Sequence, residues 1–150
     1  MFQAFLIKYG EIGVKGKNRY VFENALVDRM KEVLAETDGT FHIIREQGRI
    51  YVEAEGSFDY DETIEALKRV FGIVGICPVV LTEDHGFEAL SETVLDYMQK
   101  MYGDKTMTFK VMTRRVNKRF PMESMEVNAE LGGRILDQFP NMKVDVHHPD

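Results

Sequence analysis

The chain has 150 residues, of which 44% are hydrophobic and 29% charged, as expected for one globular domain or two small ones. Its 25 acidic and 19 basic residues give a net charge of −6, which argues against indiscriminate coating of nucleic acid. The single cysteine, Cys77, excludes an internal disulfide, and no apolar run reaches the ~20 residues needed to span a bilayer. We therefore expect a cytoplasmic protein that makes no membrane contact.

A strand and a long helix are predicted at the start of the chain. Residues 3–9 alternate in the way typical of a strand, with Phe5 and Ile7 on one face. A glycine-rich loop follows. From Asn18, a residue suited to an N-cap, apolar residues recur at helical spacing, and Gly39 ends this helix.

A hairpin and a shorter helix come next. Strands are predicted over 40–45 and 49–53, joined by a short turn. Asp59 and Glu62 have the spacing of a capping box, which predicts the start of a second helix. The buried stripe of that helix is expected to consist of Ile64, Leu67 and Phe71.

The last strand of this half is predicted over residues 73–81. Pro78 interrupts it, and proline cannot donate a ladder hydrogen bond, so the strand is expected either at a sheet edge or bent at this residue. The order β-α-β-β-α-β is that of ferredoxin-like domains, and the fold class is α+β. We expect this first domain to cover residues 1–76.

A second, α/β unit is predicted over residues 77–150. It should contain a helix, a strand over 107–113, a helix capped by Ser124 and a strand that begins near Asn141. The chain stops within that strand, so we expect an incomplete unit of a longer protein, with an exposed sheet edge that could support a homodimer. The inward-facing residues are expected to be Leu90, Val94, Tyr97, Met98 and Met101 in the first helix and Leu131, Ile135 and Leu136 in the second.

The glycine-rich loop after the first strand is also basic. Lys15, Lys17 and Arg19, with Asn18 among them, crowd the start of a helix, where each positive charge opposes the helix dipole by ~0.3–1 kcal/mol. A nearby phosphate would offset this cost, and a solvated loop would explain the lysines equally well. The spacing matches no nucleotide-binding motif.

A second basic segment gives the stronger signal. Residues 105–119 hold six Lys or Arg and no acid, and four of these charges fall within residues 114–119. Such charges repel one another unless an anion is present. This repulsion favours an RNA-binding segment over a turn whose charges are only solvated. If RNA binding neutralises about four phosphates, a plot of log K against log salt concentration should have a slope near −3. The ring of Phe120 could stack on a base or pack in the core. The candidate RNA contacts here are Lys110, Arg114, Arg115, Asn117, Lys118, Arg119 and Phe120.

No catalytic or metal-binding set is evident. Cys77 lies in an apolar run typical of a structural thiol, and the four histidines lack the spacing of a zinc site. We expect neither a metal nor a cofactor in this chain, and no turnover by it alone. Gly132 and Gly133 fall within a predicted helix, where tight packing of a neighbouring element is the favoured explanation over an approaching RNA backbone.

Two segments carry a family resemblance. Residues 7–19 (IKYGEIGVKGKNR) and the stretch over 109–121 together resemble the N-terminal region of the bacterial tRNA 4-thiouridine synthetase (ThiI) family. The resemblance extends over essentially the whole chain. Further matching positions are Ser124, Glu126, Val144, Asp145, Val146, Pro149 and Asp150.

The resemblance implies a ferredoxin-like domain followed by an incomplete THUMP domain. It also implies that both domains hold tRNA and that the THUMP domain engages the acceptor end. It implies an ATP-dependent tRNA sulfurtransferase that makes 4-thiouridine and also serves thiamine thiazole biosynthesis. A following ATP-pyrophosphatase domain would use ATP and Mg, and a cysteine desulfurase would supply the sulfur. The RNA contacts implied by motif match are Lys15, Lys17, Asn18, Arg19, Arg114, Arg115, Asn117, Lys118 and Arg119.

Two alternatives stay open at this point. The chain could be the front end of another THUMP-containing enzyme, such as a methyltransferase or a deaminase, which the sequence beyond Asp150 would decide. It could instead be a ferredoxin-like regulatory module that binds a small anion at the basic turn. Thermal-shift measurements with small anions and with RNA would distinguish this module from an RNA-binding protein.

Overall fold

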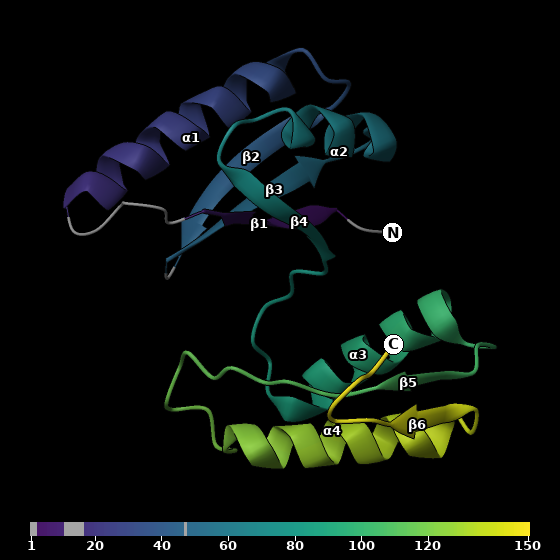
Figure 1. Cartoon of the computed structure of the whole chain (residues 1–150). Coiled ribbons are helices and arrows are strands. Elements are labelled where there is room, and N and C mark those ends of the chain that lie inside the picture. Colours follow the sequence, from purple (N-terminus) through teal and green to yellow (C-terminus); the bar gives the residue numbers. More distant parts are fainter. Residues whose placement is uncertain (1–2, 11–16, 47) are drawn as a thin grey trace. The chain divides into compact units, whose positions relative to one another are not determined.

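The computed structural model describes residues 3–10, 17–46 and 48–150, without the side chain of Lys17. The chain divides into two compact units, Met1–Thr82 (unit 1) and Glu83–Asp150 (unit 2) (Figure 1). No helix among the described residues is both long and apolar enough to cross a membrane. The elements in chain order are β1 (Ala4–Tyr9), α1 (Lys17–Ala35), β2 (Thr40–Glu46), β3 (Arg49–Glu55), α2 (Tyr60–Lys68), β4 (Ile73–Val79), α3 (Phe87–Tyr102), β5 (Met107–Phe109), α4 (Ser124–Gln138) and β6 (Met142–Val144).

Unit 1 is built on a four-stranded sheet in the order β2-β3-β1-β4, in which all neighbours are antiparallel. Helices α1 and α2 cover one face of this sheet (Figure 1). The predicted ferredoxin-like order is confirmed. The edge position predicted for β4 is confirmed as well, with Pro78 opposite Phe5 of β1.

The core of unit 1 lies between the sheet and the two helices. Phe5 and Ile7 are both buried, so the predicted inward face of β1 is confirmed. Burial of side chains of this size stabilises a fold by about 1.5–3 kcal/mol each. The buried cluster consists of Phe5, Ile7, Leu26, Val27, Met30, Leu34, Ile50, Val52, Leu67 and Val70.

Helix α1 differs from the prediction at its start and agrees with it at its end. The helix begins at Lys17, so Asn18 lies in the first turn and is not the N-cap. After the helix, Gly39 has φ of +132°, and a Cβ there would lie 2.7 Å from the Cβ of Phe58. Only glycine fits this turn, which returns the chain from α1 to β2.

Helix α2 begins as predicted and ends earlier. The side chain of Asp59 is the N-cap and accepts a hydrogen bond from the backbone N of Glu62 at 2.9 Å. The helix ends at Lys68, so Phe71, predicted to be buried, lies beyond it and is 84% exposed. Val70 fills the core instead, because the chain turns out of the helix just before it.

Unit 2 packs α3 and α4 against a pair of short parallel strands, β5 and β6 (Figure 1). Strand β5 ends at Phe109, short of the predicted 107–113, because β6 pairs with only three of its residues. Leu136, predicted inward, is exposed, and Phe139 on the next turn is buried in its place. Half-buried residues around this core are Val94, Leu95, Met98, Tyr102, Met107, Phe109 and Val111.

The start of α4 is set by two acids. Glu123, not the predicted Ser124, is the N-cap, and Ser124 is the first helical residue. Glu123 and Glu126 form a capping box, in which the backbone N of Glu123 donates to the Glu126 carboxylate at 3.4 Å. Both acids also lie at the positive end of the helix dipole, where negative charge is stabilising.

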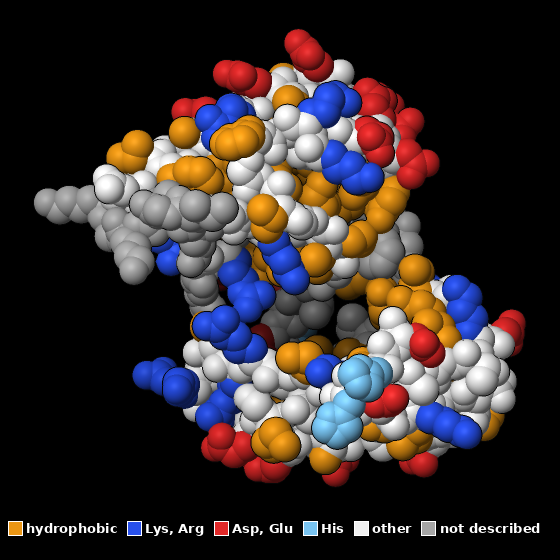
Figure 2. Space-filling view, viewed as in Figure 1, with side chains coloured by type: hydrophobic (Ala, Val, Ile, Leu, Met, Phe, Trp, Pro, Cys, Tyr) orange, Lys and Arg blue, Asp and Glu red, His pale blue; other side chains and the backbone are white. Residues whose placement is uncertain are grey.

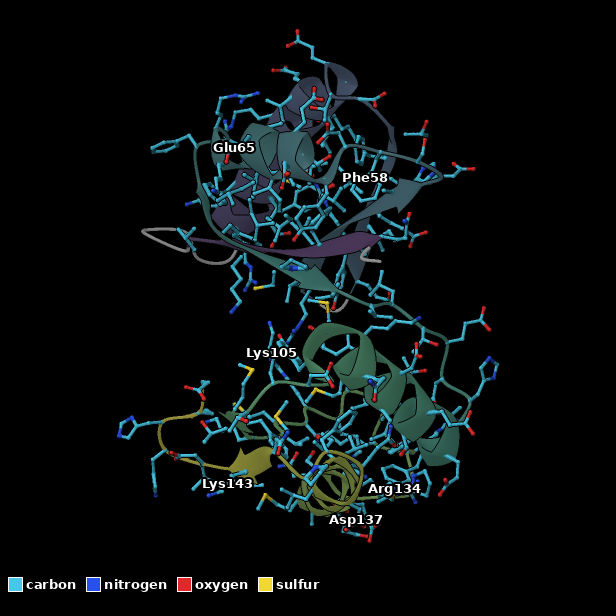
Figure 3. All side chains as sticks on the ribbon, turned by 90° about the vertical axis from the view of Figure 1, so that its right-hand side faces the viewer. Phe58, Glu65, Lys105, Arg134, Asp137 and Lys143 are labelled. Carbon is cyan, nitrogen blue, oxygen red and sulfur yellow. The ribbon has the colours of Figure 1, made fainter. Side chains whose placement is uncertain are left out.

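An arginine ties α4 to α3. The guanidinium of Arg134 donates to both carboxylate oxygens of Glu88, at 2.8 and 2.9 Å, and to the buried hydroxyl of Ser91 at 3.1 Å. Its cation also lies 4.8 Å from the ring centroid of Phe87. The hydrogen bond from Arg134 lowers the pKa of the Glu88 carboxyl. Arg134 lies on the side of α4 that faces α3, and Asp137 lies on another side (Figure 3).

Two residues of the predicted α2 stripe give a matched test of the core. Leu67→Ala should lower the free energy of unfolding of unit 1 by about 2–5 kcal/mol, because Leu67 is fully buried. Phe71→Ala should change it by no more than about 0.5 kcal/mol, because that ring is in solvent. Urea denaturation of the two variants measures both values. Equal losses would contradict this placement of the core.

Candidate nucleic-acid interface

The strongest candidate site is the segment 110–123, which joins β5 to α4 and which we call the basic loop. It contains no helix or strand. Five of the six cations of the predicted basic segment fall within it. The sixth, Lys105, precedes β5, and its ammonium lies 5.5 Å from the ring centroid of Tyr102.

Three cations of the basic loop point into solvent. Arg114, Lys118 and Arg119 are exposed, and no ion pair involves them within the described part of the chain. Lys110 is exposed as well, and its ammonium lies 3.5 Å from the carbonyl of Val146. These side chains can bind an anion without first breaking an ion pair among the described residues.

Arg115 is arranged differently from its neighbours. Its guanidinium donates to the carbonyls of Phe120 and Met122, at 3.0 and 3.3 Å, and to the carboxylate of Glu123 at 3.1 Å. Only 18% of its side chain is exposed. The guanidinium thus faces the protein backbone.

The tip of the basic loop is a hydrogen-bonded turn. The side-chain oxygen of Asn117 accepts from the backbone N of Arg119 at 3.0 Å, and its carbonyl accepts from the backbone N of Phe120 at 3.1 Å. The ring of Phe120 is half-buried. Asn117 therefore shapes the turn with its side-chain and backbone oxygens.

Acids lie close to the basic loop along α4. Glu123, Glu126 and Glu130 are all exposed at or after the helix start. In Figure 2, Lys and Arg side chains gather on the side of unit 2 where the basic loop projects, and acidic side chains follow α4. A positive patch with an acidic border favours one docking pose of a polyanion over many.

The predicted basic site of unit 1 is only partly described. Lys15 and the side chain of Lys17 lie outside the described residues. Asn18 is exposed in the first turn of α1. The Nε of Arg19 donates to the carboxylate of Glu23 at 3.1 Å, and its Nη2 donates to the hydroxyl of Tyr9 at 3.3 Å.

Tyr9 and Glu23 join the end of β1 to α1. The Tyr9 hydroxyl donates to the Glu23 carboxylate, and Arg45 of β2 donates to the Glu23 carbonyl at 3.3 Å. The hydrogen bond from Tyr9 lowers the pKa of Glu23, with Arg19 adding to the effect. Burial raises the pKa of the Tyr9 phenol, and the hydrogen bond to Glu23 raises it further. Sequence reasoning missed this cluster, because it joins side chains from separate elements.

The tight packing expected at Gly132 and Gly133 is not observed. A Cβ at either position would meet nothing within 4 Å other than the helix's own backbone and adjacent residues. The two glycines instead line a hollow of about 440 Å³ together with apolar side chains such as Val111 and Leu136. Asn128 also lines it, and its buried side-chain oxygen has no hydrogen-bond partner among the described residues.

A metal site and a reactive thiol are the other kinds of site to consider among the described residues. None of them form a group of three or more His, Cys, Asp or Glu that could hold a metal ion. Cys77 is a half-buried free thiol on β4, opposite Leu6 of β1. The basic loop remains the strongest candidate, because Arg114, Lys118 and Arg119 are exposed on it.

Comparison with known families divides the chain in the same way. Residues 4–77 match the ThiI ferredoxin-like domain, and residues 85–150 match the THUMP domain. A protein of Lachnospira eligens named "Probable tRNA sulfurtransferase" is 61% identical over the full chain. A protein of Agathobacter rectalis with the same name is 54% identical over 99% of the chain. The chain spans 38% of the length of each of these relatives.

Two solved structures share the fold. One is a 4-thiouridine synthetase–RNA complex with bound ATP, with a TM-score of 0.80 and 31% identity, and the match covers 100% of this chain and 37% of that one. The other is PH1313 from Pyrococcus horikoshii Ot3, with a TM-score of 0.77 and 33% identity over 97% of this chain and 48% of that one.

The cluster around Glu23 predicts a pH dependence of stability. The pKa of the Glu23 carboxyl is lowered from the ordinary value of 4.5. The contribution of Glu23 to the free energy of unfolding is therefore complete above pH 4.5 and is lost as the pH falls through the lowered pKa. Glu23→Gln should therefore flatten the acid limb of the stability curve of unit 1. Glu32→Gln, which removes an exposed acid of the same helix, should leave the limb steep. Urea denaturation between pH 7 and 3 makes the comparison, and parallel curves for wild type and Glu23→Gln would contradict it.

Proposed function

We propose that this chain, which belongs to the ThiI family of tRNA sulfurtransferases, is the tRNA-binding part of an enzyme that makes 4-thiouridine in tRNA. Support comes from the order of its two domains and from the names of relatives that match its full length. Those names favour a sulfurtransferase over a methyltransferase or a deaminase. Thiamine thiazole biosynthesis is a second role that we propose for the parent protein.

The single observation that carries the proposal is the basic loop. Arg114, Lys118 and Arg119 present three outward charges on a chain of net charge −6. Arginine offers planar, bidentate donors to phosphate, and lysine offers a point charge. RNA phosphates supply the counter-charge that this cluster lacks among the described residues.

The proposed ligand is the acceptor end of tRNA. A-form RNA is recognised mainly through its shape and its phosphates, and an unpaired end exposes bases that can stack. Phe120 is half-buried, which leaves part of its ring for such a contact. In unit 1, we propose that Lys15, Lys17, Asn18 and Arg19 contact the same RNA.

The chemistry of sulfur transfer belongs, in this proposal, to other parts of the enzyme. ATP and Mg would be used by a region outside the 38% of the relatives' length that this chain spans. A cysteine desulfurase would supply the sulfur, in the cytoplasm, and the parent protein could act as a homodimer. The residues described here bind and orient the RNA.

Removing the outward charges should weaken tRNA binding. The variant with Arg114, Lys118 and Arg119 all changed to alanine should bind at least about tenfold more weakly. Its plot of log K against log salt should also be shallower by about 2–3, since three phosphate contacts are lost. Filter binding at several salt concentrations measures both quantities.

The matched control changes Lys31, Lys68 and Lys100 to alanine. It removes the same number of positive charges from exposed positions on α1, α2 and α3. Its affinity and salt slope should stay close to those of wild type. If both variants weaken binding equally, net charge explains the binding and the basic loop is not the site.

The proposed contact with the acceptor end can be tested by removing the acceptor stem from the tRNA. Intact tRNA should bind more tightly than the same tRNA without its acceptor stem, by about tenfold or more, because the loop loses its phosphates. The alanine variant of the basic loop should bind both RNAs with similar affinity. Equal affinity of the wild-type chain for both RNAs would exclude the acceptor stem as the ligand.

A further inference from the structure

We infer that Arg115 is a positioning residue, which holds the basic loop in shape for the RNA and does not itself bind a phosphate. This inference deepens the proposed function and rests on it. Arg115 is one of four cations within residues 114–119, yet it alone is turned toward the protein. Its neighbour Arg114 is exposed.

The contacts of Arg115 form a clamp across the loop. One nitrogen, Nη1, donates to two carbonyls, those of Phe120 and Met122, and the other, Nη2, donates to the Glu123 carboxylate. A planar guanidinium can satisfy three acceptors in this way, and an ammonium cannot match the geometry. Residues 115 and 120–123 are thereby held together, and the segment between them becomes a closed turn.

The clamp fixes which side chains reach the ligand. Within the closed turn, Asn117 accepts hydrogen bonds from the backbone N atoms of Arg119 and Phe120. Lys118 and Arg119 are exposed on this turn, and Arg114 is exposed just before it. A loop that is already ordered loses less conformational entropy when it binds, so the clamp strengthens binding without touching the RNA.

The role of Glu123 follows from the same contacts. Its carboxylate bonds to Arg115, and the residue is the N-cap of α4, so it anchors the loop to the helix. An exposed acid beside an RNA site repels phosphate. Charge alone therefore predicts that losing Glu123 tightens binding, whereas the clamp predicts that losing it weakens binding.

The first arm of the test uses this difference in sign. Glu123→Gln should weaken tRNA binding by about threefold or more, because a charged hydrogen bond is lost. Glu130→Gln removes an equal charge from the same helix, away from Arg115, and should bind as wild type or slightly more tightly. Glu123→Gln binding as tightly as Glu130→Gln would overturn the inference.

The second arm keeps every charge in place. Arg115→Lys should weaken tRNA binding by about tenfold, and Arg114→Lys by no more than about twofold, because only Arg115 needs the fork of donors. The salt slope should remain that of wild type in both variants, because lysine keeps the positive charge. Equal effects of the two lysine variants would overturn the inference.

The third arm needs no RNA and so separates this inference from the proposed function. Trypsin should cut after Lys118 and Arg119 faster in Arg115→Lys and Glu123→Gln than in wild type, Arg114→Lys or Glu130→Gln. Wild-type rates in the first two variants would overturn the clamp. A wild-type chain that binds no tRNA would overturn the proposed function, while faster cutting would still support the clamp.

Discussion

Repulsion among like charges is the physical constraint on the basic loop of unit 2. Four cations lie within residues 114–119, and no acid falls between residues 105 and 119. The chain resolves this by turning one cation inward, where Arg115 bonds to two carbonyls and to Glu123. The inward charge closes the loop, and the remaining charges are spread over its outer side. The loop can therefore present positive charge while its backbone stays ordered.

The elements of unit 1 could be predicted because their apolar residues recur at the spacing of a strand or a helix. Alternation in β1 and the helical stripe of α1 fix which residues are buried, and both Phe5 and Leu26 are fully buried. The prediction was wrong where an element ends. Phe71 continues the i+4 spacing of Leu67, but α2 stops before reaching it. Periodicity shows where apolar residues recur and does not show where the backbone leaves the helix.

The candidate site was predictable in its charge and not in its geometry. The sequence alone located the basic loop, because five of its residues are cations of the acid-free stretch 105–119, which holds six cations. The inward turn of Arg115 depends on loop dihedral angles, which no spacing rule encodes. The N-cap of α4 was also missed, because serine is a preferred N-cap residue and glutamate is not, so the sequence favoured Ser124 over Glu123.

The position of Glu123 links stability to recognition. At the N-terminus of α4 a carboxylate is favoured by the helix dipole, whereas beside a phosphate site it is unfavourable. Both effects act on one side chain, and its bond to Arg115 pairs its exposed charge with a guanidinium. Under the proposed function, the outward cations of the basic loop would then attract the phosphates of the RNA. The exposed acids along α4 would disfavour other poses of a polyanion on unit 2.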